Sequence, residues 1–288
     1  MLERGFRVSA LVRSPGKAGH LAAQGVSLIP GDLHRPAALQ RLVADCDAVI
    51  HAAGAVRGSS QAAFDAVNVA GTAAVVAAIK SRTNPPRLLL LSSLAAREPD
   101  LSWYARSKRD AEKLLEGESG MDWLIVRPPA VYGPGDKEML AVFRAMARGI
   151  ATVPGSAEAR TSLIHVSDLV AAIIQCLQTQ STRHQILTLC DGRPDGYDWH
   201  ELARIAGTTW GRQVRVWRVP GWLLDTLARL NIWTAGITGR APMLTPAKLR
   251  ELRHTDWVVD NRAITAATGW TPLISLTEGL AELQKSAL

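Results

Sequence analysis

The chain has 288 residues, 47% apolar and 20% charged, which is ordinary for a globular protein and enough for one large or two unequal domains. Its three widely spaced cysteines fit neither a disulfide framework nor a metal knuckle, and its histidines show no paired ligand spacing. We therefore expect no metal, signal peptide or transmembrane segment, and a cytoplasmic location.

Strands and helices are predicted to alternate over the first 130 residues. The predicted strands are Phe6–Val12, Val26–Ile29, Asp47–His51, Arg87–Leu91 and Trp123–Val126. The predicted helices are Pro15–Gln24, Arg35–Ala44, Ser60–Ser81 and Trp103–Leu115. Such alternation predicts an α/β fold, a Rossmann-like doubly wound parallel sheet with helices on both faces.

After residue 130 the pattern loosens. Further helices are predicted at Glu138–Arg148, Ser167–Gln178 and Leu276–Gln284, and further strands at Gln185–Leu189 and Gln213–Arg218. Seven of the nine tryptophans follow residue 190. We therefore expect residues 1–130 to form the nucleotide-binding domain. Residues 131–288 would form a smaller, irregular substrate-binding lobe, with some segments returning to the sheet.

The net charge is +7, and residues 201–255 hold nine Lys and Arg against three Asp and Glu. This excess fits an anionic substrate, a membrane surface, nucleic acid or simply a solvated face. Nucleic acid is the least favoured, because no helix-turn-helix, zinc-finger or RNA-binding signature accompanies the charge.

The most informative motif is Tyr104-Ala-Arg-Ser-Lys108, because residues four apart share one face of a helix. A nearby ammonium is expected to lower the pKa of the phenol, so that it can exchange a proton with a substrate oxygen. The motif alone is common by chance. It gains weight from Ser92 and Ser93, which follow a buried strand at the sheet edge where α/β proteins bind ligands.

Several further motifs follow in order along the chain. They are Val49-Ile-His-Ala-Ala-Gly54, Asn68-Val-Ala-Gly-Thr72, Arg127-Pro-Pro-Ala-Val-Tyr-Gly-Pro-Gly135, Ile164-His-Val-Ser-Asp-Leu169, Asp256-Trp257, Gly269-Trp-Thr-Pro272 and Glu278-Gly-Leu280. With the Tyr/Lys pair, they resemble the extended short-chain dehydrogenase/reductase family, also called the NAD-dependent epimerase/dehydratase family. The resemblance covers nearly the whole chain.

The resemblance implies an NAD(P)-dependent enzyme with a small-molecule substrate, and a homodimer is one assembly that it allows. Tyr104 would be the acid/base, Lys108 its ribose-holding partner, and Ser93 the hydroxyl that polarises the substrate. The cofactor would contact Asp32 and Leu33 at the adenine, Ala52, Ala53 and Gly54 through the backbone, and Pro128 near the nicotinamide. Asn68 would stand where the family has a helix-distorting asparagine.

The family's first strand and its Gly-x-x-Gly-x-x-Gly loop have no counterpart here, and Met1–Arg4 resembles the end of the helix that follows them. Two strand edges are therefore expected to lack a partner. Either the natural protein is longer, or this shorter chain binds its cofactor poorly. We favour the longer protein, because every later motif is intact.

Arg13 ends a predicted strand where an enzyme that prefers NAD usually has Asp or Glu, which favours NADP(H) unless Arg13 is merely solvated. The tryptophan-rich lobe favours an apolar or ring-shaped substrate, and the short gap of 11 residues from Ser93 to Tyr104 favours carbonyl/alcohol interconversion. Two alternatives stay open, a nucleotide-sugar epimerase or dehydratase and a non-catalytic sensor or assembly protein. The epimerase is suggested by basic residues that suit a diphosphate, namely Arg215, Arg218, Arg240, Lys248, Arg250 and Arg253.

Overall fold

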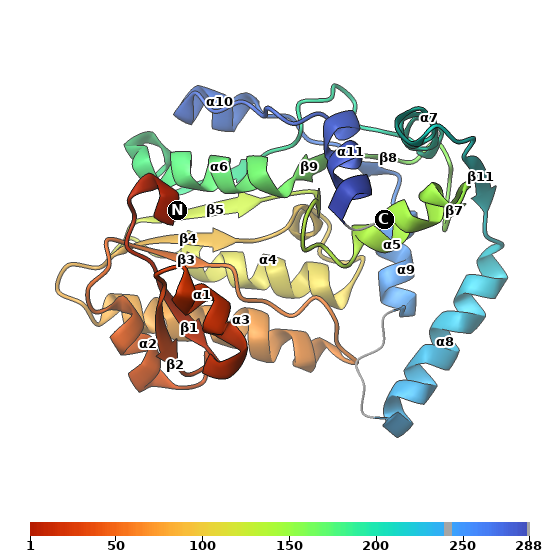
Figure 1. Cartoon of the computed structure of the whole chain (residues 1–288). Coiled ribbons are helices and arrows are strands. Elements are labelled where there is room, and N and C mark those ends of the chain that lie inside the picture. The colour runs from red at the N-terminus through yellow and green to blue at the C-terminus, as the bar shows by residue number, and fades with distance from the viewer. Residues whose placement is uncertain (239–243, 287–288) are drawn as a thin grey trace.

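The centre of the computed structural model is a parallel four-stranded sheet in the order β10–β5–β4–β3. These strands are β3 (Ala48–His51), β4 (Arg87–Leu91), β5 (Trp123–Arg127) and β10 (Gln185–Thr188). Figure 1 shows α6 (Val166–Gln178) over one face, with α3 (Gln61–Lys80) and α4 (Trp103–Glu116) over the other. The predicted α/β class is confirmed. The structure describes residues 1–238 and 244–286, so Arg240 lies outside the described residues.

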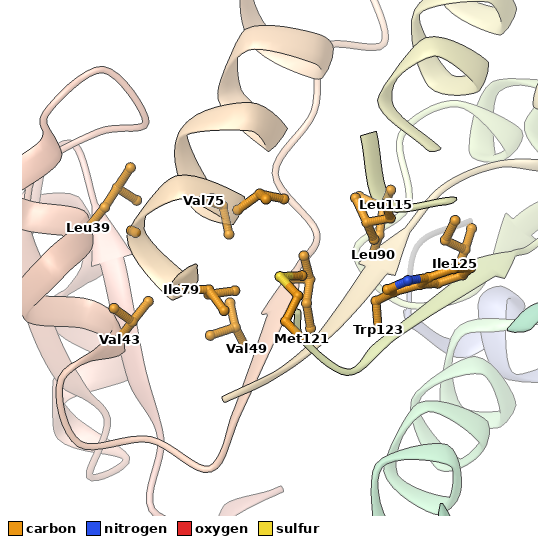
Figure 2. Packing of buried hydrophobic residues seen from close by; sticks show 13 residues of the cluster. Leu39, Val43, Val49, Val75, Ile79, Leu90, Leu115, Met121, Trp123 and Ile125 are labelled. Carbon is orange, nitrogen blue, oxygen red and sulfur yellow. The ribbon is translucent and has the colours of Figure 1, made fainter. Parts of the chain in front are cut away.

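Alternating side chains of β4 and β5 supply two separate cores. Leu88, Leu90 and Ile125 pack against α3 and the end of α4, in the cluster that Figure 2 shows. Leu89 and Leu124 point the other way and pack with residues of α6. Because both faces of the central strands are buried, their sequences are continuous apolar runs.

The helix α3 is the one described helix that is long and apolar enough, by length and composition, to cross a bilayer. Its residues Val75, Val76 and Ile79 lie in the core beneath the sheet. Its apolar composition is therefore accounted for by packing inside the protein.

A second sheet contains β1 (Ser9–Val12) and β2 (Ser27–Pro30), with α2 (Pro36–Val43) beside them. Among the described residues, β1 pairs only with β2, and β3 pairs only with β4. Residues of β1 and β3 line one groove of about 1800 Å³. The edges of β1 and β3 that face this groove therefore lack a strand partner in the described parts of the chain, as the sequence predicts.

The predicted helix Pro15–Gln24 is only partly α-helical. It consists of a 3₁₀ turn, η2 (Pro15–Ala18), and a short helix, α1 (Gly19–Ala23). Neither begins with a side-chain cap, and two glycines lie within the segment. Both features weaken a regular helix.

The second half of the chain contains three two-stranded pairs, β6 (Ala130–Tyr132) with β9 (Leu163–His165), β7 (Ile150–Val153) with β11 (Arg215–Arg218), and β8 (Arg160–Thr161) with β12 (Asp256–Trp257). Its helices are α5 (Met139–Ala147), α7 (Trp199–Trp210), α8 (Gly221–Thr238), α9 (Pro246–Arg253), α10 (Arg262–Thr268) and α11 (Leu276–Ser286). Short 3₁₀ turns complete the chain at η1 (Leu2–Arg4), η3 (Leu94–Arg97) and η4 (Gln180–Thr182). The helices α7, α8, α9 and α10 were not predicted, so this half of the chain has more regular secondary structure than the sequence indicated.

Candidate active site

The predicted catalytic residues meet where β4 ends and α4 begins. Ser102 caps α4 by accepting a hydrogen bond from the Ala105 backbone N–H at 3.0 Å, which fixes where the helix starts. Tyr104 and Lys108 follow on one face of that helix, one turn apart. The Lys108 ammonium reaches back to donate a hydrogen bond to the Leu91 carbonyl at 3.0 Å. The helix therefore holds both side chains against the carboxyl edge of the sheet.

Burial of the phenol raises the pKa of Tyr104 to about 12. A hydrogen bond with Ser93 opposes this shift, and the carboxylate of Glu251 adds to it. The expectation that Lys108 lowers the phenol's pKa was wrong, because loss of water around the ring has the larger effect. The structure does bring the Tyr104 and Ser93 side chains together. Ser93 also begins η3, where its hydroxyl accepts a hydrogen bond from the Ala95 N–H at 3.2 Å.

Two residues of α9, Lys248 and Glu251, lie close to Tyr104. The Lys248 ammonium stands 5.9 Å from the centre of the Tyr104 ring, and Glu251 accepts a hydrogen bond from Ser102 at 2.7 Å. Phe64 of α3 lies against the same ring, with centroids 6.2 Å apart. These groups leave a cavity of only about 20 Å³ beside the phenol. The tyrosine is thus enclosed from the side of the second lobe.

Lys108 is itself buried, and burial lowers its pKa to about 8 while the charge of Glu112 works in the opposite direction. Glu112 is fully buried one turn further along α4. It accepts hydrogen bonds from Ser92 at 2.6 Å and from the Arg127 side chain at 2.8 and 2.5 Å. This network joins α4 to the ends of β4 and β5, and it places a compensating carboxylate behind Lys108.

Asn68 connects the loop after β3 to α4. Its amide accepts a hydrogen bond from the Ala55 N–H at 2.7 Å and donates to the Ser107 hydroxyl at 2.8 Å. A side chain at Gly54 would begin 3.2 Å from Asn68 Oδ1 and 3.3 Å from Lys108 Nζ. The loop therefore approaches Lys108 closely because position 54 is a glycine, and Asn68 holds it there.

Most of the residues predicted to bind the cofactor line the groove between β1 and β3. Arg13, Asp32, Leu33, Ala52, Ala53 and Gly54 all line it. Asp32 accepts a hydrogen bond from the His34 N–H at 2.9 Å, whereas Arg13 is exposed at the end of β1. Pro128 lies apart from this lining, where its carbonyl accepts a hydrogen bond from the Leu94 N–H at 2.8 Å.

A dinucleotide fits the residues that meet here. The groove extends along the whole length of β1 and β3, and Arg13, Ala52, Ala53 and Gly54 line its part at the carboxyl ends of these strands, where such folds bind nucleotides. One cation, Arg13, stands at its edge, and a second, Lys108, is buried beside Gly54. Within the part of the chain that the structure describes, Leu91 is the one hydrogen-bond acceptor of Lys108, although an ammonium has three N–H donors.

Other residues of the site were missed from the sequence. Glu112 stands four residues after Lys108, and this spacing could have indicated a shared helix face. Glu251 and Lys248 come from α9. Lys248 was predicted only as one of the basic residues that suit a diphosphate, and nothing in the local sequence of either residue indicates contact with α4. No group of three or more His, Cys, Asp or Glu side chains in residues 1–238 and 244–286 is placed to hold a metal ion.

Comparisons with known proteins agree with this geometry. A family model described as NAD(P)H-binding matches residues 1–180. The chain is 37% identical over 258 residues to ceramide reductase from Caulobacter vibrioides, covering 89% of this chain and 80% of the relative. It is 27% identical to UDP-glucose 4-epimerase from Vibrio cholerae, covering 64% of this chain and 53% of that protein. Among solved structures, RMD from Pseudomonas aeruginosa complexed with NADPH matches with a TM-score of 0.67 at 20% identity, covering 97% of each chain.

The parallel sheet, the Tyr/Lys helix at its carboxyl edge and these matches define an NAD(P)-dependent oxidoreductase of the extended short-chain dehydrogenase/reductase type. Within that class, the chain belongs to the NAD(P)H-binding family whose model it matches.

Proposed function

We propose that this enzyme uses NADPH to reduce a ketone on a long-chain, lipid-like substrate, with Tyr104 as the proton donor. The observation that carries the proposal is the meeting of Ser93, Tyr104 and Lys108 beside the groove at the carboxyl edge of the sheet. In this account, residues up to about 130 bind the cofactor, and much of the remaining chain forms the substrate side.

The proposed roles follow from the environment of each group. Because the pKa of Tyr104 is raised to about 12, the phenol is protonated at neutral pH and can donate to a substrate oxygen. The Ser93 hydroxyl, hydrogen-bonded to that phenol, orients the same oxygen. Lys108 holds a ribose hydroxyl, and Gly54 and Asn68 keep the adjoining backbone close. A reduced nicotinamide, when bound, supplies the hydride.

The lipid-like substrate is inferred from the ceramide reductase relative and from the apolar surroundings of Tyr104. The small cavity at the phenol is lined in part by Val56, Phe64 and Trp103. We therefore propose a ceramide-class substrate that carries a ketone, which the enzyme reduces to a secondary alcohol. The epimerase relative keeps a second candidate open, and Lys248 beside Tyr104 is the cation that would suit a diphosphate.

A substrate panel tests this choice. NADPH oxidation is followed with a 3-oxo ceramide in detergent micelles and with a short water-soluble 3-oxo amide. Epimerisation of a UDP-sugar, which leaves no net change in the cofactor, is followed with NAD⁺ by chromatographic separation of the two sugar epimers. The proposal expects turnover of both ketones, with the long-chain one preferred. Turnover of the UDP-sugar alone would instead assign the epimerase reaction, and no turnover of any compound would favour a non-catalytic binding protein.

The cofactor preference is assigned to Arg13, which stands exposed where a 2′-phosphate would extend. A charged contact contributes ~1.5–3 kcal/mol, so Arg13→Ala is expected to weaken NADPH binding roughly ten- to a hundredfold and to leave NADH binding unchanged. Both dissociation constants are measured by fluorescence titration. Arg41→Ala, an exposed arginine on α2 outside the groove lining, is the matched control. Equal affinity of the unmodified chain for the two cofactors would refute the assignment.

A further inference from the structure

The helix α8 exposes an apolar face along the edge of the molecule, where Figure 1 shows it in cyan. Trp222 is 71% exposed, Leu227 45% and Leu230 52%, and Leu223 is exposed beside them. Leu223, Leu227 and Leu230 recur at intervals of four and three residues, so they share one side of the helix. An unpaired helix of a globular protein normally turns polar residues outward, and α8 does the opposite on this side.

The attachment of α8 to the rest of the protein leaves this side free. Ala228 is fully buried, and Asp225 forms an ion pair with Arg253 of α9 at 2.9 Å. At 100° per residue, these two contacts lie on the side of the helix opposite Leu223, Leu227 and Leu230. The apolar side therefore points away from α9, and its exposure is a consequence of how the helix is anchored.

Exposed arginines accompany the apolar side. In β11, which directly precedes α8, Arg215 and Arg218 are exposed and Trp217 is 64% exposed, and Arg229 is exposed on α8 itself. The three acidic residues of 201–255 already form ion pairs, Glu201 with Arg160, Asp225 with Arg253 and Glu251 with Lys248. None of Arg215, Arg218 and Arg229 forms an ion pair within 4.0 Å among the described residues. The surface thus combines apolar side chains with arginines that form no ion pair within 4.0 Å among the described residues, although the charge of Glu158 acts on Arg218.

We propose that this surface docks onto a lipid bilayer that contains anionic headgroups. The α8 face consists of Trp217, Trp222, Leu223, Leu227 and Leu230 together with Arg215 and Arg218. Tryptophan and leucine side chains enter the boundary between headgroups and acyl chains, while arginines contact the phosphates. A second copy of the chain suits the face less well, because a two-fold contact would bring the same arginine-bearing surface against itself.

The α8 face is connected to the candidate active site through α9. Arg253 of α9 holds α8, whereas Glu251 and Lys248, on the same helix, contact Ser102 and the Tyr104 ring. Docking would therefore set the substrate side of the enzyme next to the bilayer that contains a long-chain lipid. This link to the substrate rests on the proposed function, whereas the bilayer contact stands on the α8 face alone.

Vesicle co-sedimentation tests the contact on the full chain. Vesicles of phosphatidylcholine are compared with vesicles that also contain phosphatidylglycerol, and binding only to the latter is expected. Leu227→Glu combined with Leu230→Glu should abolish binding. Arg215→Gln combined with Arg218→Gln should weaken it about 25-fold, since each arginine near an anionic surface contributes about fivefold. Leu273→Glu, at a leucine that is 82% exposed outside the α8 face, is the matched control and should bind like the unmodified chain.

Three results would overturn the docking proposal. The first is that the chain binds neither kind of vesicle. The second is that it binds vesicles but the four α8-face substitutions leave this binding unchanged. The third is that the chain forms a dimer in solution, that the leucine substitutions dissociate this dimer, and that vesicles are not bound. Turnover of the short water-soluble ketone is measured on the same variants and should be unchanged. A chain that binds anionic vesicles through this face but reduces no ketone would support docking and contradict the proposed function, so the two failures are distinguishable.

Discussion

At the scale of single residues, His51 is a neutral group held inside the protein. It lies buried at the end of β3, with its Nε2 3.1 Å from the Thr72 hydroxyl. Burial lowers its pKa to about 4, and the positive charge of Lys108 adds to the shift. The imidazole therefore stays uncharged in the folded protein at a pH where it would be protonated in the unfolded chain.

This difference makes stability depend on pH. The unfolded chain binds the proton with a pKa near 6.5, so the contribution of His51 is fully present above pH 6.5. It is lost as the pH falls towards 4, by up to about 3 kcal/mol. His51→Gln should flatten this part of the profile of unfolding free energy against pH, measured by urea denaturation. The exposed His34→Gln should not change the profile, and an unchanged slope in His51→Gln would contradict the assignment.

Glu112 is expected to have two separable effects. Glu112→Gln leaves the Arg127 guanidinium without its buried carboxylate, which should cost about 3–5 kcal/mol of unfolding free energy. It also removes the charge that raises the pKa of Lys108, so Lys108 should lose its proton at a lower pH than about 8. The alkaline fall in NADPH affinity should therefore move to lower pH.

Glu116→Gln, which lies one turn further along α4 and pairs with Arg109, is the control for both readouts. If Glu112→Gln lowers stability but does not shift the pH profile of NADPH binding, then Glu112 stabilises the fold around α4 and does not set the pKa of Lys108.

At the scale of elements, the two sheets should differ in local stability. Both strands of the β1–β2 pair have an edge without a strand partner, and neither has a fully buried residue, whereas β4 and β5 are buried on both faces. Amide hydrogen exchange should therefore be at least about a hundredfold faster in β1 and β2 than in β4 and β5. NADPH should slow exchange in β1, since the groove lies along it, and leave β4 unchanged. Equal protection of the two sheets would refute this.

Elements with a strong local signal could be predicted from the sequence, and those that depend on tertiary contacts could not. Arg87–Leu91 was predicted with the observed bounds, because a continuous leucine run fits a strand buried on both faces. The long helix α3 was found within one residue at each end, helped by the serines that flank it. The helices α8 and α9 were missed. Apolar residues of α8 lie on more than one side of the helix, including the buried Ala228, and α9 is held by contacts with distant residues.

The candidate site divides in the same way. The proximity of Ser93, Tyr104 and Lys108 could be predicted, because a short motif and a strand end fix their positions, while their catalytic roles stay a prediction. The raised pKa of Tyr104 could not be foreseen, because it arises from enclosure by residues of other elements and from Glu251, which is distant in sequence. The groove could not be predicted from the sequence either, because Arg13 and Gly54, which are distant in sequence, line the same groove only in the folded chain.

At the scale of the whole molecule, α9 stands beside Tyr104 and connects it to α8, and the groove proposed to bind the cofactor lies along β1 and β3. In the proposed function, the groove binds NADPH, and Tyr104 donates the proton. These two functions should therefore separate when the tyrosine alone is changed.

The most direct test of this account is turnover of a 3-oxo ceramide with NADPH by Tyr104→Phe. Loss of a positioned acid typically lowers the rate ~10²–10⁴-fold, and the dissociation constant of NADPH should stay within about twofold, because the lost hydroxyl serves only the proton step. Tyr132→Phe, whose hydroxyl lies 3.5 Å from its nearest acceptor, the Ser275 carbonyl, is the matched control and should keep nearly full activity. Undiminished turnover in Tyr104→Phe would contradict the mechanism.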